Sequence, residues 1–455
     1  MFVAAAVVVA AFAAFTTWRV CCGRPTPHGP SIVLILTDDQ RWDSIAKMPN
    51  VERLLVHHGV NFTNGFVVNS LCCPSRASIL TGRYSHSTGI YTEKAPYGGE
   101  PMFDASSTVA TWLQDAGYHT ALFGKYMNEY RGADVPPGWD DWLAFQQSDH
   151  GYYANYSAND NGTIRRFGAT AADYSTDVLR RRAVSFIHRE QGPLFLYFAP
   201  YAPHAPATPA PVDRHAFTRL PPFHPPSFDE RNMSDKPRWM HSLPKIPRST
   251  IDAFRRHQYQ SLLDVDRSVA AIVRALRATG RLHHTLIAFV TDNGISWGEH
   301  RWMRKEVPYE ESIRTPYVVR YDPMTRHPRI DRHLVLNIDL APTFASMAGV
   351  AAPGAEGRSL APLLAGRRTR WRHDFLIEHV RGTTRPDPPT FCAVRTERYL
   401  YALYSTGERE LYDLRRDPYE LRNAAGRPES ATIEARLRRR LGELCKPPPP
   451  TFGAP

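Results

Sequence analysis

The sequence predicts an α/β fold, because short apolar runs alternate along the chain with segments of helical periodicity. The run "SIVLILTDDQ", residues 31–40, is rich in Val, Ile and Leu, which is typical of a strand buried on both faces of a parallel sheet. Three later runs have the same character: 119–126, 193–204 and 284–294. Helical patterns lie between and after these runs, at 108–116, 173–189, 252–279 and 338–348.

The length of 455 residues suits a large domain with a smaller one attached. Beyond about residue 356 the pattern changes to short strands joined by turns, with a last helix near 428–443. We therefore predict a large α/β domain over residues 31–355 and a smaller α+β subdomain over 356–455. The proline-rich segment 205–250 shows little periodicity and is predicted to be a long surface excursion.

The charge balance is basic, with 56 Lys and Arg residues against 45 Asp and Glu residues. A net charge of +11 favours anionic partners, such as acidic membranes, nucleic acids or sulfated and phosphorylated substrates. The chain contains no continuous basic run of the nucleic-acid-binding type, and "RLRRR" at 436–440 fits the solvated face of a terminal helix. We therefore expect no nucleic-acid partner.

Residues 2–18 are apolar and uncharged. This segment is short for a membrane span, but its length suits a secretory signal or a signal anchor. We predict a signal peptide or signal anchor within residues 1–22, and therefore an exported protein, whether secreted, periplasmic or in a lysosomal-type lumen. Any membrane contact would be made through this segment. A buried core helix is the alternative.

Export would bring the chain into an oxidising compartment, where disulfides form. Cys392 and Cys445 are a possible pair, although connectivity does not follow from the sequence. A host that glycosylates secreted proteins would also meet four Asn-x-Ser/Thr sites, at Asn61, Asn155, Asn161 and Asn232.

Carboxylates follow two of the predicted strands. Asp38 and Asp39 end the first, and Asp292 and Asn293 end the last. The carboxyl ends of strands are where open α/β sheets place their sites. Each pair taken alone also fits a helix N-cap or a turn. Two acidic strand ends in one sheet favour a shared ion with hard oxygen ligands, such as calcium or magnesium.

Three single cationic residues could complete such a site: Lys125, His204 and Lys305. Each taken alone is an ordinary solvated side chain. Beside a metal ion they would form a clamp for an oxyanion.

The stretch "SLCCPSRASILTGR", residues 70–83, puts two adjacent cysteines before a predicted short helix. A zinc site lacks further ligands at the usual spacing, and a vicinal disulfide would be strained. A catalytic thiol would need a base, and this alternative stays open. Pro74 suits the first turn of a helix that ends near Gly82. Cys72 would then lie just outside the helix N-terminus with Arg76 one turn in, which suits an anion.

This stretch resembles the sulfatase signature C-x-P-S-R followed by T-G-R. The segments "ILTDDQ", "FGKYMNEY", "APHAP", "TDNG" and "YEESIRTP" are similar to other sulfatase motifs, so the resemblance spans about 31–350. Within the family, it points to the N-acetylglucosamine-6-sulfatase, heparan endosulfatase and bacterial arylsulfatase-like group. It implies an alkaline-phosphatase-superfamily fold, with a large, mostly parallel mixed sheet between helices and a small C-terminal domain with an antiparallel sheet.

The resemblance also implies roles for individual residues. A maturation enzyme would convert Cys72 to formylglycine, whose hydrate would be the nucleophile, and Cys73 would be a packed thiol. Arg76 would hold the hydrate, and His204 would assist the leaving oxygen or the sulfate. Lys125 and Lys305 would bind the sulfate, with Arg304 as an alternative one residue away. One calcium ion would be bound by the formylglycine oxygen and four side chains: Asp38, Asp39, Asp292 and Asn293.

The implied activity is that of a sulfuric ester hydrolase acting on a sulfated carbohydrate, such as the N-acetylglucosamine-6-sulfate type, or on an aryl sulfate. A phosphonate or phosphodiester hydrolase on the same scaffold is an alternative, as is a non-catalytic protein that binds sulfated glycans. The sequence departs from many arylsulfatases after Lys125, where Met127 replaces a His and Asn128 follows. Poorer activity on small aryl esters is the expected result.

Overall fold

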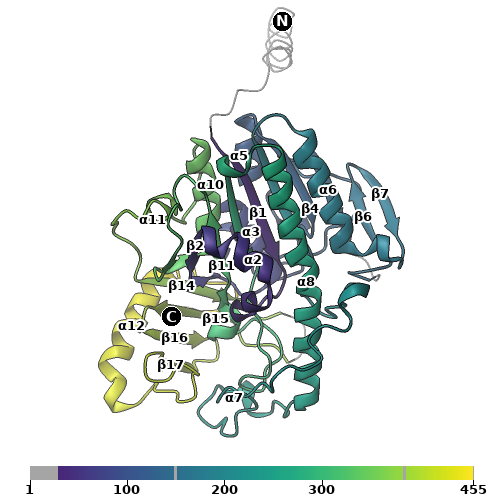
Figure 1. Cartoon of the computed structure of the whole chain (residues 1–455). Coiled ribbons are helices and arrows are strands. Elements are labelled where there is room, and N and C mark those ends of the chain that lie inside the picture. The colour runs from purple at the N-terminus through teal and green to yellow at the C-terminus, as the bar shows by residue number, and fades with distance from the viewer. Residues whose placement is uncertain (1–28, 148–150, 383–385, 454–455) are drawn as a thin grey trace, which may run out of the picture.

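The computed structural model describes residues 29–147, 151–382 and 386–453 (Figure 1). Its central element is a ten-stranded sheet in the order β12-β2-β11-β9-β1-β8-β4-β5-β6-β7. The strands have the following bounds: β12 (Arg329–Asp331), β2 (Val60–Phe62), β11 (Tyr317–Arg320), β9 (Thr285–Thr291), β1 (Ser31–Thr37), β8 (Leu194–Ala199), β4 (His119–Gly124), β5 (Asp141–Phe145), β6 (Tyr156–Asp160) and β7 (Thr163–Phe167). The four strands predicted from apolar runs are β1, β4, β8 and β9, which are neighbours in the centre.

The centre of this sheet is parallel, because β9, β1, β8, β4 and β5 pair in the same direction. Antiparallel pairs appear toward both edges. Strand β1 shows why helices are needed on both faces. Ile32, Leu34 and Leu36 belong to one apolar core, and Val33 and Ile35 belong to another. The predicted fold class, a mixed and mostly parallel sheet between helices, is confirmed.

Six helices carry most of the packing on the two faces (Figure 1). On the face of Val33 lie α2 (Pro49–Leu54), α6 (Ser175–Arg189) and α8 (Arg248–Ala278). On the face of Ile32 lie α3 (Cys72–Thr81), α5 (Val109–Asp115) and α10 (Leu340–Ala348). Helix α8 buries one stripe of its surface at helical spacing, as Leu262, Val265, Val269 and Val273 show. The helices predicted within the α/β domain are therefore confirmed.

The remaining elements are short and belong to the connections between the main helices and strands. A small three-stranded sheet consists of β10 (Arg314–Thr315), β3 (Gly65–Phe66) and β13 (Val335–Leu336). Four short helices belong to the connections: α4 (Ser85–Thr88), α7 (Arg238–His241), α9 (Glu310–Ile313) and α11 (Ala361–Leu364). Short segments of 3-10 helix occur at Trp42–Lys47, Val56–His58, Glu100–Met102, Ala171–Asp173, Pro211–Asp213, Leu282–His284, Asn337–Asp339 and Pro428–Ser430.

The C-terminal part is an antiparallel sheet with one long helix. Its strands pair in chain order: β14 (Asp374–His379), β15 (Phe391–Thr396), β16 (Tyr399–Tyr404) and β17 (Arg409–Asp413). Helix α12 (Ala431–Leu444) packs Leu437 and Leu441 against one face of the sheet. A disulfide joins Cys392 on β15 to Cys445, the residue after α12. The small antiparallel sheet that was predicted is therefore present.

The two parts share an apolar core. Phe66 and Tyr309 from the first part pack in one cluster with Phe375, Phe391 and Tyr412 of the C-terminal sheet. The sheet is therefore fixed to the α/β part by buried side chains. A domain division at residue 356 stays a prediction.

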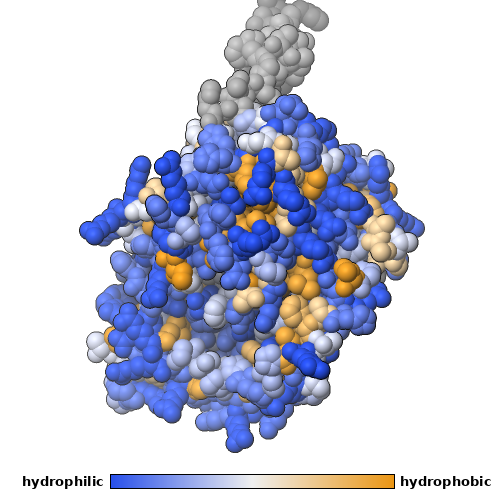
Figure 2. Space-filling view, viewed as in Figure 1, coloured by the Kyte–Doolittle hydropathy of each residue, from blue (hydrophilic) through white to orange (hydrophobic). Residues whose placement is uncertain are grey.

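The surface in Figure 2 is largely hydrophilic, with small apolar patches scattered over it. Arg436, Arg438 and Arg439 on α12 are exposed, as predicted for a solvated face. Within the described residues, no helix has both the length and the apolar character that a membrane crossing requires. The signal peptide or anchor predicted for residues 1–22 lies outside the described residues.

The disulfide between Cys392 and Cys445 should stabilise the C-terminal part, because it closes a loop with a sequence separation of 53 residues. Replacing both cysteines by alanine is expected to lower the free energy of unfolding by about 2–4 kcal/mol. Denaturant unfolding of both proteins under non-reducing conditions measures the difference. An unchanged unfolding midpoint would contradict the stabilising role.

Candidate active site

Two acidic strand ends meet at the carboxyl edge of the central sheet. Strands β1 and β9 pair in parallel so that Thr37 lies opposite Thr291, and Asp38 and Asp292 therefore follow side by side. Asp39 has a φ of 60°, in the left-handed region, so the chain turns there. Its backbone N–H donates to Oδ1 of Asp292 at 3.2 Å. The register of one strand pair thus brings the predicted carboxylates together.

Cys72 lies at the same point, at the start of α3. The helix begins at Cys72 itself, with Leu71 as its N-cap, and not after Cys72 as predicted. The difference is within the usual variation of helix ends. The Sγ atom of Cys72 lies 3.3 Å from Oδ1 of Asp38. The helix ends at Gly82, whose φ of 72° is the left-handed conformation that glycine adopts readily.

Cys73 faces away from these groups. It is fully buried in the apolar core on the α3 face of the sheet, and its Sγ lies 4.0 Å from Sδ of Met127. Neither Cys72 nor Cys73 forms a disulfide. The expected separation of the two cysteines into one residue at the site and one packed thiol therefore agrees with their positions.

Three cationic side chains contact the carboxylates. Arg76 is fully buried one turn into α3, and its Nε and Nη2 lie 2.8 Å from Oδ2 of Asp292. Its Nη1 donates to the carbonyl oxygen of Lys125 at 2.7 Å. Lys125 follows β4, and its Nζ pairs with Oδ2 of Asp38 at 2.5 Å.

Lys305 completes the group from a loop after β9. Its Nζ pairs with Oδ1 of Asp39 at 2.5 Å and donates to Sγ of Cys72 at 2.7 Å. Arg304 points elsewhere, since its Nη2 lies 2.6 Å from Oε1 of Glu306. Of the two alternatives in the sequence, Lys305 is therefore the one that the fold brings to Cys72.

His204 lies at the edge of the group and is partly exposed. Its Nδ1 lies 2.7 Å from the carbonyl oxygen of Ala205. Because a carbonyl oxygen can only accept a hydrogen bond, Nδ1 carries a proton and donates it in this contact. Its Nε2 lies 3.7 Å from Oδ2 of Asp39. The ring nitrogen left free by the backbone contact thus faces the carboxylates.

Burial and charge act against each other on these carboxyl groups. Burial opposes ionisation of Asp38, but Lys125 and the other nearby cations hold its pKa far below the usual value. Burial likewise opposes ionisation of Asp39, and Lys305 and His204 lower its pKa. For Asp292, burial and the charge of Asp38 raise the pKa. Burial, followed by the charge of Asp38, raises the pKa of the Cys72 thiol well above its usual value.

The acidic residues fit a hard divalent cation. Ligand atoms of Asp38, Asp39, Cys72 and Asp292 all lie within 4.8 Å of one another. Asn293 adds an amide whose Oδ1 is buried and has no hydrogen-bond partner among the described residues. Carboxylate and amide oxygens are the donors that calcium prefers. The donor set therefore agrees with the ligands that the family resemblance implied.

Sequence reasoning missed one polar residue that supports this site. Gln258 on α8 donates from Nε2 to the carbonyl oxygens of Asp39, at 3.3 Å, and of Pro203, at 3.1 Å. It therefore fixes two turns that carry site residues. The only signal in the sequence was a glutamine on the buried stripe of a long helix.

Met127 and Asn128 occupy the positions where the sequence departs from many arylsulfatases. Met127 is buried against Cys73, and its thioether cannot carry a proton. Asn128 is also buried, and its Oδ1 has no hydrogen-bond partner among the described residues. The carbonyl oxygen of Asn128 accepts from the N–H of Glu100 at 2.7 Å.

The comparison with known families agrees with this geometry. The chain matches the sulfatase family over residues 30–350, and the N-sulphoglucosamine sulphohydrolase C-terminal family over residues 298–447. The chain therefore belongs to the sulfatase family, as its motifs predicted.

The similarity to individual proteins is more specific. N-acetylglucosamine-6-sulfatase of Homo sapiens is 31% identical over 87% of this chain and 81% of the relative. An extracellular sulfatase SULF-1 homolog of Drosophila melanogaster is 34% identical over 77% of this chain, but the match spans only 33% of that longer protein. The predicted resemblance to the N-acetylglucosamine-6-sulfatase group is confirmed.

Solved structures show the same fold. One, described as a complex with its substrate D-glucosamine-2-N,6-O-disulfate, has a TM-score of 0.81 and 24% identity, covering 92% of this chain and 99% of its own. The phosphonate monoester hydrolase of Agrobacterium radiobacter has a TM-score of 0.73 and 21% identity, covering 92% of this chain and 95% of its own. At these identities the likeness shows the fold alone.

The guanidinium of Arg76 should stabilise the folded protein by compensating buried carboxylates. Arg76→Met keeps much of the side-chain volume but leaves Asp292 and Asp38 without this partner. Breaking such a buried pair is expected to lower the free energy of unfolding by about 3–5 kcal/mol. Denaturant unfolding measures the change, and Arg53→Met on the exposed side of α2 is the control, with an effect within about 0.5 kcal/mol. Equal effects of the two substitutions would contradict this role for Arg76.

Proposed function

We propose that this protein is a sulfuric ester hydrolase that cleaves sulfate monoesters, with Cys72 converted to formylglycine. The convergence of Cys72, Arg76, Lys125 and Lys305 at one buried point carries the proposal. A sulfate monoester resists nucleophilic attack because its oxygens are negatively charged. Cations placed around the sulfate compensate this negative charge and so make attack on the sulfur easier. Membership of the sulfatase family supports the same activity.

The formylglycine hydrate would supply two hydroxyl groups, one to attack sulfur and one to release sulfate as the aldehyde re-forms. Lys125 and Lys305 neutralise charge on the non-bridging sulfate oxygens, and Arg76 orients the hydroxyl groups at position 72. His204 gives a proton to the ester oxygen as its bond to sulfur breaks, so the product leaves as a neutral alcohol. Met127 provides no second proton donor beside Lys125.

Calcium is the proposed resident ion, held by Asp38, Asp39, Asp292, Asn293 and the oxygen of residue 72. When bound, it would lower the charge on the sulfate and on the attacking oxygen. Lys125 and Lys305 would then turn from the carboxylates toward the sulfate, since the ion takes over the compensation of those carboxylates.

The proposed substrate is a sulfated carbohydrate of the N-acetylglucosamine-6-sulfate type. The human relative is named for that activity, and the net charge of +11 favours an anionic glycan. We also propose export through residues 1–22, maturation by a formylglycine-generating enzyme, and a catalytic domain over 31–355 followed by a subdomain over 356–455. Relatives named extracellular sulfatases support export.

A phosphonate or phosphodiester hydrolase is the second candidate, because a phosphonate monoester hydrolase shares the fold. Rates of cleavage of nitrophenyl sulfate and of a nitrophenyl phosphonate ester distinguish the two candidates.

We expect the sulfate to be cleaved faster than the phosphonate. We also expect Cys72→Ala to lose this activity while circular dichroism shows that the fold is retained. We expect mass spectrometry of the peptide that contains residue 72 to give the mass of formylglycine at that position. Faster phosphonate cleavage, or activity that persists in Cys72→Ala, would overturn the proposal.

Calcium binding should stabilise the protein, because the ion compensates Asp38, Asp39 and Asp292 in the folded state only. Calcium at a hundred times its dissociation constant is expected to raise the free energy of unfolding by about 2.7 kcal/mol over the chelator-treated protein. Differential scanning calorimetry with and without calcium detects the shift. Asp292→Asn should reduce the shift, and Glu397→Gln on the exposed C-terminal surface should not. No shift in the unsubstituted protein would contradict a calcium site.

A further inference from the structure

Three buried side chains that could bind a metal ion lie together outside the catalytic group. His300 belongs to the loop after β9, Glu311 to α9, and Glu420 to the segment after β17. Each offers one ligand atom, and these atoms all lie within 4.8 Å of one another. The group therefore joins two segments of the α/β part to one segment of the C-terminal part.

Each of these side chains has a buried atom without a partner. The atoms are Nε2 of His300, Oε2 of Glu311 and Oε1 of Glu420, and none has a hydrogen-bond partner among the described residues. His300 and Glu420 are 1% exposed, and Glu311 is 9% exposed. Buried polar atoms without partners are uncommon in folded proteins and point to a missing water, ion or ligand. Three such atoms in one group indicate a shared ligand.

Hydrogen bonds fix the orientation of two of the side chains. Nδ1 of His300 lies 2.6 Å from Oε2 of Glu230. Because a carboxylate accepts hydrogen bonds, Nδ1 carries the proton in this contact and Nε2 keeps a free lone pair. Oε2 of Glu420 accepts from the N–H of Glu310 at 3.1 Å, which leaves Oε1 free. A histidine that binds a metal ion commonly donates its other ring N–H to a carboxylate, as His300 does here.

The two glutamates of the group lack a cation of their own. In the part of the chain that the structure describes, neither Glu311 nor Glu420 forms an ion pair. The cations nearby pair with other carboxylates: Arg41 with Glu299 at 2.6 Å, Arg395 with Glu310 at 2.7 Å, and Lys236 with Glu230 at 3.7 Å. Two buried carboxylates this close repel each other unless a cation or a proton lies between them. A divalent cation would compensate both charges at once.

The surroundings of the group exclude water. The ring of His300 packs against the ring of Tyr309, with centroids 4.4 Å apart. Tyr309 and Tyr412 both belong to the apolar core that the α/β part shares with the C-terminal sheet. The attraction between an ion and its carboxylate ligands is stronger in such an environment than in water.

The ligand types favour a zinc-type ion over calcium. Imidazole nitrogen and carboxylate oxygen are common ligands of Zn²⁺, whereas Ca²⁺ takes oxygen ligands. Three protein ligands would leave one position of a tetrahedral ion for a water molecule. The histidine therefore distinguishes this group from the oxygen donors of the proposed calcium site.

We propose that His300, Glu311 and Glu420 bind one zinc-type divalent cation, through Nε2 of the imidazole and one oxygen of each carboxylate. The ion is structural, because it ties the segment after β17 to α9 and to the loop that also carries Lys305. Glu230 is a positioning residue that orients His300. The inference is independent of the proposed function, since none of these residues is placed at the reacting atoms.

The test measures zinc binding by the whole chain with calcium at saturation, so that the proposed calcium site is occupied. Elemental mass spectrometry counts the bound zinc, and competition with a chelating dye gives the dissociation constant. We expect one zinc ion per chain in the wild-type protein. Glu230→Gln changes only the partner of His300 and should weaken zinc binding about 10–100-fold, and Glu420→Gln, which removes a ligand, should weaken it more.

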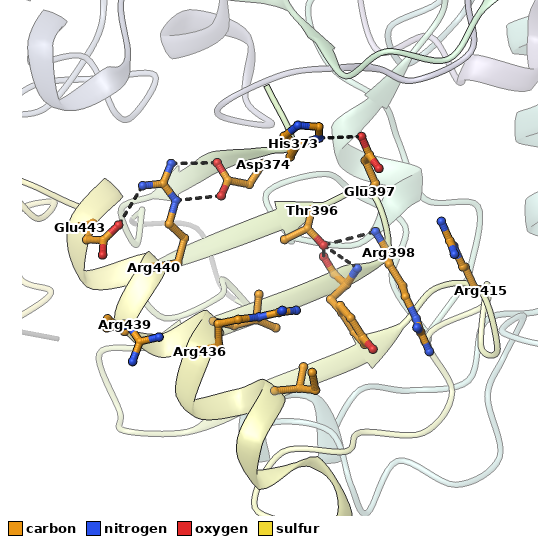
Figure 3. A pocket seen from close by; sticks show the side chains of 13 residues that line it. His373, Asp374, Thr396, Glu397, Arg398, Arg415, Arg436, Arg439, Arg440 and Glu443 are labelled. Carbon is orange, nitrogen blue, oxygen red and sulfur yellow. Dashed lines mark hydrogen bonds and ion pairs between the residues drawn. The ribbon is translucent and has the colours of Figure 1, made fainter. Parts of the chain in front are cut away.

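Matched control substitutions come from the C-terminal surface. His373 and Glu397 form an exposed pair, with Nδ1 3.1 Å from Oε1, and both line a pocket of about 660 Å³ between α12 and the C-terminal sheet (Figure 3). This pair offers the same two residue types without burial. We expect His373→Asn and Glu397→Gln to bind zinc as the wild-type protein does.

A second measurement covers variants that fold poorly. Co²⁺ replaces Zn²⁺ in many proteins, and its visible absorption reports tetrahedral coordination. We expect this absorption in the wild-type protein and its loss in Glu311→Gln, with circular dichroism showing that the fold is retained. Zinc should also raise the Tm of the wild-type protein but not that of Glu311→Gln.

Three results would overturn the inference. The first is a wild-type protein that takes up no zinc, which would mean that protons or water hold the group together. The second is zinc binding that persists unchanged in Glu420→Gln. The third is zinc binding that is lost in Asp292→Asn, because the ion would then occupy the carboxylate cluster at the ends of β1 and β9. None of these results bears on sulfate cleavage, so the proposed function is tested separately.

Discussion

The compensation of buried charge at the carboxyl edge of the central sheet is the constraint on which the rest of the structure depends. Asp38, Asp39 and Asp292 are buried. An uncompensated charge at such a point costs several kcal/mol, so each carboxylate must meet a cation or a bound ion. This requirement explains why segments far apart in the chain end together. Helix α3 brings Arg76 one turn from its start, the end of β4 brings Lys125, and a loop after β9 brings Lys305.

A buried carboxylate outside this cluster helps to hold the loop of Lys305. Glu410 on β17 accepts hydrogen bonds from the hydroxyls of Tyr309, Tyr404 and Tyr412. Tyr309 follows Lys305 by four residues, and the two other tyrosines belong to the C-terminal sheet. The hydroxyl donors satisfy the carboxylate that burial would otherwise make unfavourable. The C-terminal sheet therefore contributes to the site by fixing the loop that carries its third cation, although it supplies no residue to the carboxylate cluster.

The sequence was informative where one rule of local structure fixed a position. Continuous apolar runs predicted β1, β4, β8 and β9, and the rule that sites lie at the carboxyl ends of such strands led to Asp38, Lys125 and Asp292. The strands β2, β11 and β12 at one side of the sheet were not predicted, since each has three or four residues and depends on pairing with distant segments. The hydrogen bond from the N–H of Glu306 to the carbonyl oxygen of Ser70 was missed for the same reason, because only the folded chain brings position 70 next to position 306.

The complete burial of Cys72 fixes an order of events. In the folded chain its side chain has no exposed surface and lies under Nζ of Lys305, against Asp38. A second protein cannot reach an atom in that position without opening the contact between α3 and the end of β1. An enzyme that converts Cys72 to formylglycine, as we propose, would therefore act before α3 packs against the end of β1 and before Lys305 reaches Cys72. The packing that excludes solvent from Cys72 would thus also exclude the maturation enzyme once the chain has folded.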